Sequence, residues 1–143
     1  MTQEDKNLLL KDLCARLPYG VKVQSYSYED DIKTVETLYN IDSDGYMSTL
    51  ECDTLKNITK PYLFPLSSMT EEQKYDFYCR FIENDCDFAD FKEFYLDGGM
   101  WHKLSTSLDD IEAIIDWFHK KHFDWRGLIP MGLANDATGL NIY

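Results

Sequence analysis

The chain has 143 residues, of which 44% are hydrophobic and 15% aromatic, and its formal net charge is −12 at pH 7. This length and composition exclude a disordered chain and predict a single domain over residues 1–143, with a core that needs no disulfide or metal support. The acidic excess argues against direct nucleic acid binding, because a phosphate backbone must be neutralised by Lys and Arg side chains.

Residues 3–17 predict an amphipathic helix. Thr2 and Asp5 have the spacing of a capping box, in which each side chain accepts a hydrogen bond from the backbone N–H of the other residue. Residues 18–20, Pro-Tyr-Gly, end the helix. One apolar stripe with helical spacing is formed by Leu9, Leu10, Leu13, Cys14 and Leu17.

Residues 21–66 predict the β-rich part of the domain. From Val21 onward the chain alternates with a period of two, which is typical of a strand. Residues 42–45, Asp-Ser-Asp-Gly, predict a turn, after which residues 46–52 return as a third strand. The second strand is indicated by the alternating residues Val35, Thr37, Tyr39 and Ile41.

Two further segments have clear local signals. Residues 60–65 contain a proline near each end, so we expect an extended segment there. Thr70 is the predicted N-cap of a second helix, with Gln73 as its capping-box partner.

Residues 67–143 predict a mainly helical part. The clearest helix spans 107–121, with acidic residues at its start and basic residues at its end, as the helix dipole favours. Residues 85–105 fit a helix or a strand pair around two glycines, and we slightly favour the strand pair. The predicted class is therefore α+β: an N-terminal helix, a small antiparallel sheet or SH3-like partial barrel, and C-terminal helices packed on it.

Residues 40–51 match the spacing of an EF-hand calcium loop. Hard oxygen ligands would come from Asn40, Asp42, Asp44 and Glu51. The flanking residues alternate like strands, however, and Asp-Gly between strands is a strong hairpin signal. We therefore favour a hairpin and keep a calcium-binding module as an alternative.

Two histidines lie near the end of the last predicted helix. His119, His122 and Asp124 could bind a metal or carry acid–base chemistry, and His102 is the remaining histidine that could complete a metal site. A small metal-dependent hydrolase is therefore a second alternative. Basic residues at a helix C-terminus also have a structural explanation, so we assign no catalytic residue and no cofactor.

Aromatic and acidic side chains offer candidates for protein contacts. Trp101 follows two glycines, and Trp125 and Arg126 follow the last helix. The stretch 85–101 is rich in acids and aromatics and contributes Asp87, Asp90 and Glu93. The aromatic residues around the last helix could form an exposed patch, but we favour their packing in the core; they are Trp117, Phe118, Phe123, Trp125 and Tyr143.

Residues 5–23, 60–73 and 116–134 resemble a family of short proteins from gut bacteria, their phages and mobile elements. The resemblance implies a cytoplasmic protein linked to mobile elements, and it transfers no catalytic or binding residue.

The four cysteines include no Cys-x-x-Cys pair, and we expect reduced thiols. The sequence contains no run of about 18 apolar residues, which a membrane span would need. We expect a non-enzymatic protein that binds an unidentified protein partner, such as a host or defence protein.

Overall fold

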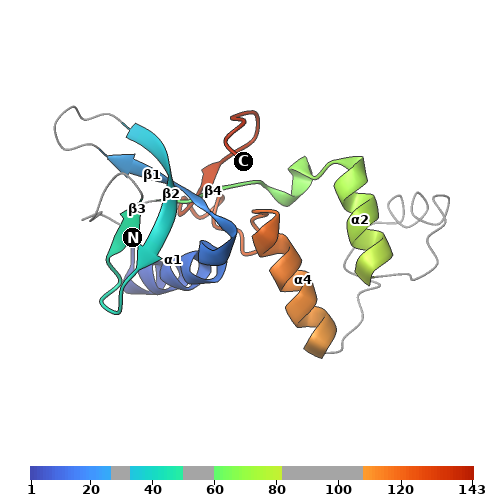
Figure 1. The fold of residues 1–143 in the computed structure, drawn as a ribbon, viewed down its shortest axis with the longest axis horizontal. Helices are drawn as coiled ribbons and strands as arrows, with labels where there is room; N and C mark the ends of the chain where they lie inside the picture. Colours follow the sequence, from blue (N-terminus) through green and yellow to red (C-terminus); the bar gives the residue numbers. More distant parts are fainter. Residues whose placement is uncertain (27–32, 50–59, 82–107) are drawn as a thin grey trace. The chain divides into compact units, whose positions relative to one another are not determined.

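The structure is a computed structural model, described here for residues 1–26, 33–49, 60–81 and 108–143 (Figure 1). These residues form helices and small sheets, which confirms the α+β class. They divide into two compact units, Met1–Leu66 with Phe118–Tyr143, and Ser67–Trp117. The C-terminal residues 118–143 thus belong to the same unit as the N-terminal residues.

Helix α1 spans Gln3–Arg16 and begins with the predicted capping box. Oγ1 of Thr2 accepts a hydrogen bond from the backbone N–H of Asp5 at 3.1 Å, and Oδ2 of Asp5 accepts one from the N–H of Thr2 at 2.7 Å. The predicted apolar stripe is wrong at Cys14, which is exposed. Asp12 and Arg16 are buried instead, because their opposite charges meet on the inner side of the helix.

The first sheet contains strands β1 (Lys22–Tyr26), β2 (Lys33–Ile41) and β3 (Met47–Thr49), all antiparallel and in that order. This confirms the predicted small antiparallel sheet and the hairpin between β2 and β3. The register of β2 against β3 shifts between Leu38 and Asn40, so one extra residue is inserted in β2. The remainder of the predicted third strand, from residue 50 onward, lies outside the described residues.

A second, two-stranded sheet joins distant parts of the first unit. Strand β4 (Tyr62–Leu63) runs parallel to β5 (Asn135–Asp136), and isolated bridges join Val23 to Pro61 and Phe64 to Phe123. The extended segment predicted at residues 60–65 is thus confirmed. Its position beside the C-terminal chain was not predicted, because pairing between distant residues leaves no local sequence signal.

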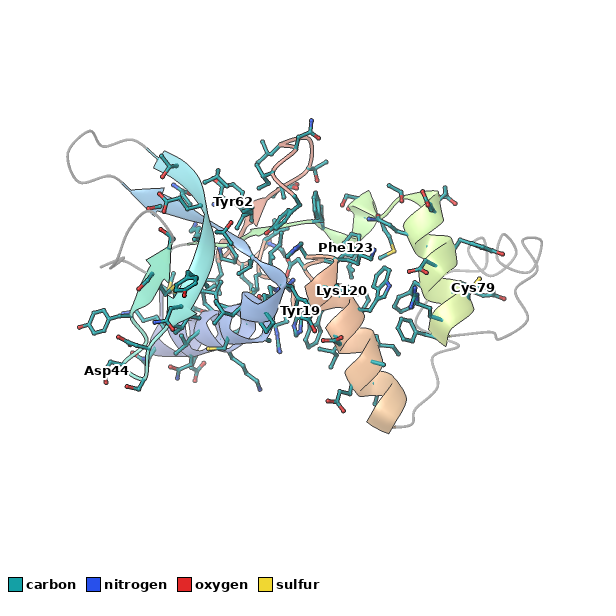
Figure 2. All side chains as sticks on the ribbon, in the orientation of Figure 1. Tyr19, Asp44, Tyr62, Cys79, Lys120 and Phe123 are labelled. Carbon is teal, nitrogen blue, oxygen red and sulfur yellow. The ribbon has the colours of Figure 1, made fainter. Side chains whose placement is uncertain are left out.

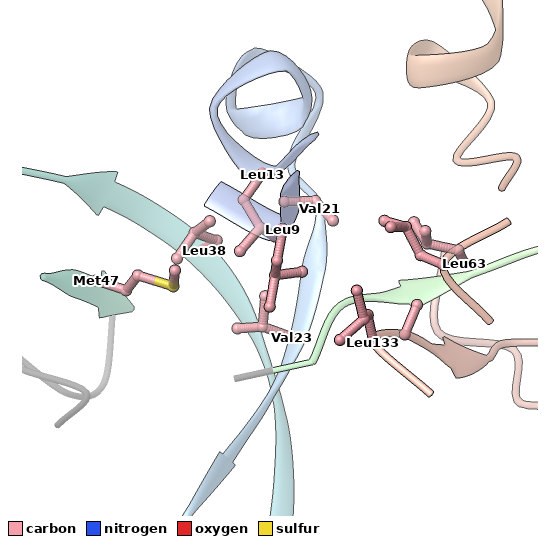
Figure 3. Packing of buried hydrophobic residues seen from close by; sticks show 10 residues of the cluster. Leu9, Leu13, Val21, Val23, Leu38, Met47, Leu63 and Leu133 are labelled. Atoms are coloured by element: carbon pink, nitrogen blue, oxygen red, sulfur yellow. The ribbon is translucent and has the colours of Figure 1, made fainter. Parts of the chain in front are cut away.

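The core of the first unit lies between α1, the antiparallel sheet and the C-terminal loops (Figure 3). Each fully buried Leu or Val contributes about 1.5–3 kcal/mol relative to an exposed position. The buried members of the cluster are Leu9, Leu13, Val21, Val23, Leu38, Met47, Leu63, Leu128, Leu133 and Ala134.

The second unit contains α2 (Glu71–Phe81) and most of α4 (Leu108–Lys120). Thr70 and Gln73 form the predicted capping box of α2, with bonds of 2.9 and 3.2 Å. Nε1 of Trp117 donates to Oδ2 of Asp76 at 3.0 Å, so the indole anchors α4 to α2. Ile111 of α4 is 42% exposed.

Two predictions about this part of the chain have different outcomes. Cys79 is disulfide-bonded, so the expectation of reduced thiols is wrong at this position. The strand pair predicted within 85–105 lies outside the described residues. Within the described residues, none of the helices is long and apolar enough to cross a membrane.

Candidate functional site

The candidate site begins where α4 ends. His122 has a left-handed backbone with φ of 59°. Its N–H donates to the carbonyl of His119 at 3.1 Å, and the N–H of Phe123 donates to the carbonyl of Phe118 at 2.9 Å. These two bonds form a Schellman motif, in which glycine usually occupies the left-handed position. The motif turns the chain sharply at Phe123 (Figure 2).

Asp124 fixes the loop that follows. Its side chain is only 6% exposed, and its two carboxylate oxygens accept hydrogen bonds from the N–H groups of Leu128 and Ile129, each at 2.8 Å. A buried carboxylate is tolerated when backbone donors surround it. The Asp124 carboxylate therefore fixes the loop at Leu128 and Ile129, and both of its oxygens accept backbone hydrogen bonds.

Asp12 and Arg16 connect α1 to the same loop. Oδ2 of Asp12 lies 2.6 Å from Nε of Arg16, and both side chains are 0% exposed. Nη2 of Arg16 donates to the carbonyl of Phe123 at 2.8 Å. A second cation, Nε of Arg126, binds Oδ1 of Asp12 at 3.2 Å. One buried carboxylate thus joins two guanidinium groups that are distant in sequence.

Trp125 and Arg126 form a stacked pair beside this charge cluster. The Cζ atom of Arg126 lies 4.1 Å from the ring centroid of Trp125. Nε1 of Trp125 donates to Nε2 of His119 at 3.0 Å. Since Nε2 of His119 accepts this bond, it carries no proton in this arrangement. The nearest oxygen of Asp12 is 3.9 Å from that nitrogen, which is too far for a hydrogen bond.

His122 and Tyr143 form a second aromatic pair. Their rings are stacked with centroids 3.8 Å apart and an interplanar angle of 16°. The Tyr143 hydroxyl donates to the carbonyl of Tyr62 at 2.6 Å and accepts from the N–H of Lys22 at 3.0 Å. Burial, with smaller contributions from the positive charges of Arg16 and Lys22, lowers the pKa of His122 to about 4. Burial raises the pKa of Tyr143 to about 12.

The proposed metal ligands do not converge in the described part of the chain. His119 bonds to Trp125, His122 stacks on Tyr143, and Asp124 caps a backbone loop. Within the described ranges, no group of three or more His, Cys, Asp and Glu side chains could hold a metal ion. His102 lies outside these ranges.

The calcium-loop candidates lie at the β2–β3 hairpin. Oδ1 of Asp42 accepts bonds from the N–H groups of Asp44 and Tyr46, both at 2.9 Å. Asn40 belongs to β2, whereas Glu51 lies outside the described residues. Strands therefore flank this loop on both sides, whereas the alternative of an EF-hand calcium loop requires flanking helices.

No family model, curated protein or solved structure matches this chain. Among the predicted partner-binding residues, the structure brings Trp125 and Arg126 together. The other four, Trp101, Asp87, Asp90 and Glu93, lie outside the described residues. Trp117, Phe118 and Phe123 are buried, which confirms core packing for these three aromatics. Trp125 is half-buried and Tyr143 is 43% exposed, so the expected core packing is wrong for Tyr143.

Two residues of the site, Asp12 and Arg16, were missed from the sequence. They had a usable signal, because an acid and a base four residues apart on a helix can pair. Tyr143 was named among the C-terminal aromatics, but its hydrogen-bond partners in β1 and β4 had no local signal, since they are 121 and 81 residues away.

Proposed function

We propose that this chain is a non-enzymatic protein that acts by binding another protein through Trp125 and Arg126, termed here the Trp125–Arg126 corner. The observation that carries the proposal is the cation–π pair at 4.1 Å, held by the buried Asp12 and by His119. Trp and Arg are the residue types most enriched among energetically dominant interface contacts. Because both side chains are already fixed, little conformational entropy would be lost on binding.

The surroundings of the corner also support a protein contact. Arg126 and Trp125 are partly exposed, and the nearby loop presents Met131 at 49% exposure. Gly127 has a φ of 76°, and its carbonyl accepts the N–H of Met131 at 3.3 Å, so the loop has a defined shape. A partly polar rim around an aromatic anchor is typical of protein interfaces.

The resemblance to proteins of phages and mobile elements supports a host or defence protein as the partner. A cytoplasmic location belongs to the same proposal. The disulfide at Cys79 weighs against a reducing compartment, because disulfides seldom persist there. The redox state of Cys79 in cells that produce the protein is therefore a direct test of this part.

The binding proposal is tested by photo-crosslinking in host cells, with the crosslinker at Met131 and the adduct identified by mass spectrometry. Arg126→Gln should reduce the yield of the specific adduct severalfold, because it removes the guanidinium from Trp125. Lys121→Gln is the matched control, since it removes one exposed positive charge at the end of α4. Equal adduct yield from both variants, or no adduct with the unmodified corner, would overturn the proposal.

A further inference from the structure

The β2–β3 hairpin exposes two tyrosines, Tyr39 in β2 and Tyr46 just before β3. Leu38 is 2% exposed and Met47 is 3% exposed, whereas Tyr39 is 67% and Tyr46 is 53% exposed. Tyr39 is exposed because it alternates with the buried Leu38, and the register shift between Leu38 and Asn40 then returns Ile41 to the core. We call Tyr39, Asp42, Asp44 and Tyr46 the hairpin face.

The hairpin face has a fixed shape. Oδ1 of Asp42 accepts two backbone bonds within the turn, and the N–H of Gly45 donates to the carbonyl of Asp42 at 3.0 Å. Gly45 has a φ of 82°, and a Cβ added there would lie 3.7 Å from the side chain of Leu10 in α1. The hairpin tip therefore packs close to α1, and this contact helps to fix the turn that carries Tyr46.

The hairpin that carries these rings has acidic and no basic side chains. Asp42 and Asp44 are exposed at the tip, where Asp44 is labelled in Figure 2. Residues 39–49 contain no Lys or Arg, and the whole chain has a net charge of −12. The cation that borders the face along β1, Lys22, donates from Nζ to Oγ1 of Thr37 at 2.6 Å.

We propose that the hairpin face docks an arginine-bearing, positively charged segment of a protein partner. An arginine side chain can lie flat on a tyrosine ring while its N–H groups bond a nearby carboxylate, a combination that lysine reproduces poorly. The acidic hairpin and the net charge of −12 attract such a segment before contact. This inference rests on the proposed protein-binding function and adds the chemistry of the partner and a second contact surface, separate from the Trp125–Arg126 corner.

The experiment is an NMR titration of the full-length ¹⁵N-labelled chain with three short peptides. They alternate glycine with arginine, lysine or glutamate. The arginine peptide should shift the backbone signals of residues 39–49 and bind about fivefold more tightly than the lysine peptide, while the glutamate peptide should cause no shift. Signals that shift mainly outside 39–49, or equal affinity for arginine and lysine, would overturn the inference.

Two variants separate the aromatic and electrostatic contributions. Tyr39→Ser combined with Tyr46→Ser should reduce affinity for the arginine peptide by about tenfold or more, whereas Asp44→Asn should reduce it by about two- to threefold and flatten its salt dependence. Leu140→Ser is the control, because Leu140 is also exposed, at 48%, but belongs to the C-terminal loop. Preserved NMR spectra outside the hairpin establish that each variant is folded.

The outcomes distinguish this inference from the proposed function. Wild-type affinity in the double tyrosine variant overturns the hairpin face alone, provided that the crosslinked adduct still depends on Arg126. Loss of that adduct's dependence on Arg126, with specific arginine-peptide binding retained, overturns the corner as the binding site and leaves the hairpin face supported.

Discussion

Asp12 and Arg126 are 114 residues apart in sequence, yet Oδ1 of Asp12 and Nε of Arg126 are 3.2 Å apart. Arg16 shares the same carboxylate, and it is fully buried. The carboxylate of Asp12 therefore connects α1 to the loop that follows α4. Removing a buried carboxylate with two cationic partners lowers the stability of the fold strongly, because both cations lose their opposite charge.

Asp12→Ala should lower the free energy of unfolding by about 3–5 kcal/mol, because the buried guanidinium of Arg16 would be left without its carboxylate. Urea unfolding followed by tryptophan fluorescence measures the change. The double variant Asp12→Leu with Arg16→Met should be less destabilised than Asp12→Ala alone, since it removes the buried charge together with its partner.

The exposed ion pair in α2 provides the control for this prediction. Glu71 and Lys74 are 2.9 Å apart, with the Glu71 side chain 77% exposed. Glu71→Ala should cost no more than about 1 kcal/mol, as is usual for surface pairs. A loss of less than about 1 kcal/mol for Asp12→Ala would show that the buried cluster does not stabilise the fold as expected.

Asp124→Ala should destabilise the protein by about 2–4 kcal/mol, because two N–H groups, those of Leu128 and Ile129, lose their acceptors. Asp124→Asn should cost less, since its amide oxygen can still accept one bond. Thermal unfolding by circular dichroism compares the two. Asp136→Ala is the control, because Asp136 caps Thr138 at an exposed turn. Similar losses for Asp124→Ala and Asp136→Ala would contradict the capping role.

Local signals predicted the elements of the fold well. The Thr2–Asp5 and Thr70–Gln73 capping boxes formed as expected, since each depends on residues three positions apart. The hairpin at Asp42 formed for the same reason. Such short-range patterns restrict the backbone before any tertiary contact is made.

The candidate site was harder to predict because its contacts are distant in sequence. Trp125 and Arg126 could be selected by residue type, but the role of Asp12 depends on how α1 meets the C-terminal loop. Alternation also gives only the period of a strand: the inserted residue in β2 turns Ile41 toward the core, although the sequence pattern groups it with the exposed Tyr39.

His122 should make stability depend on pH. Its pKa is about 4 in the folded protein against a usual value of 6.5, so the unfolded chain binds more protons between these values. The stabilisation is therefore complete above pH 6.5 and is lost as the pH falls toward about 4. After allowance for solvent screening, the loss is on the order of 2 kcal/mol.

The comparison for this prediction is His122→Asn, which does not titrate and tolerates the left-handed backbone. Urea unfolding across the same pH range should show a shallower decline for the variant than for the wild type. An NMR titration of the His122 ring gives its pKa directly. A pKa near the usual value of 6.5, or equal slopes for the two proteins, would contradict the buried, neutral imidazole.

Tyr143→Phe should keep the ring on His122 but remove the hydroxyl that joins the N–H of Lys22 to the carbonyl of Tyr62. The expected cost is about 1–2 kcal/mol, since two backbone groups lose one partner. Tyr39→Phe, at a 67% exposed position, should change stability by less than about 0.5 kcal/mol.

Alkaline titration tests the same hydroxyl independently. The Tyr143 pKa is raised from 10.0 to about 12, so the unfolded chain releases this proton first. The associated stability is complete below pH 10.0 and is lost as the pH rises toward about 12. Wild-type protein should therefore lose stability more steeply than Tyr143→Phe over this range. Its ultraviolet absorbance should also show one tyrosine that ionises late, and the absence of that late step in wild-type protein would contradict a hydroxyl held by Lys22 and Tyr62.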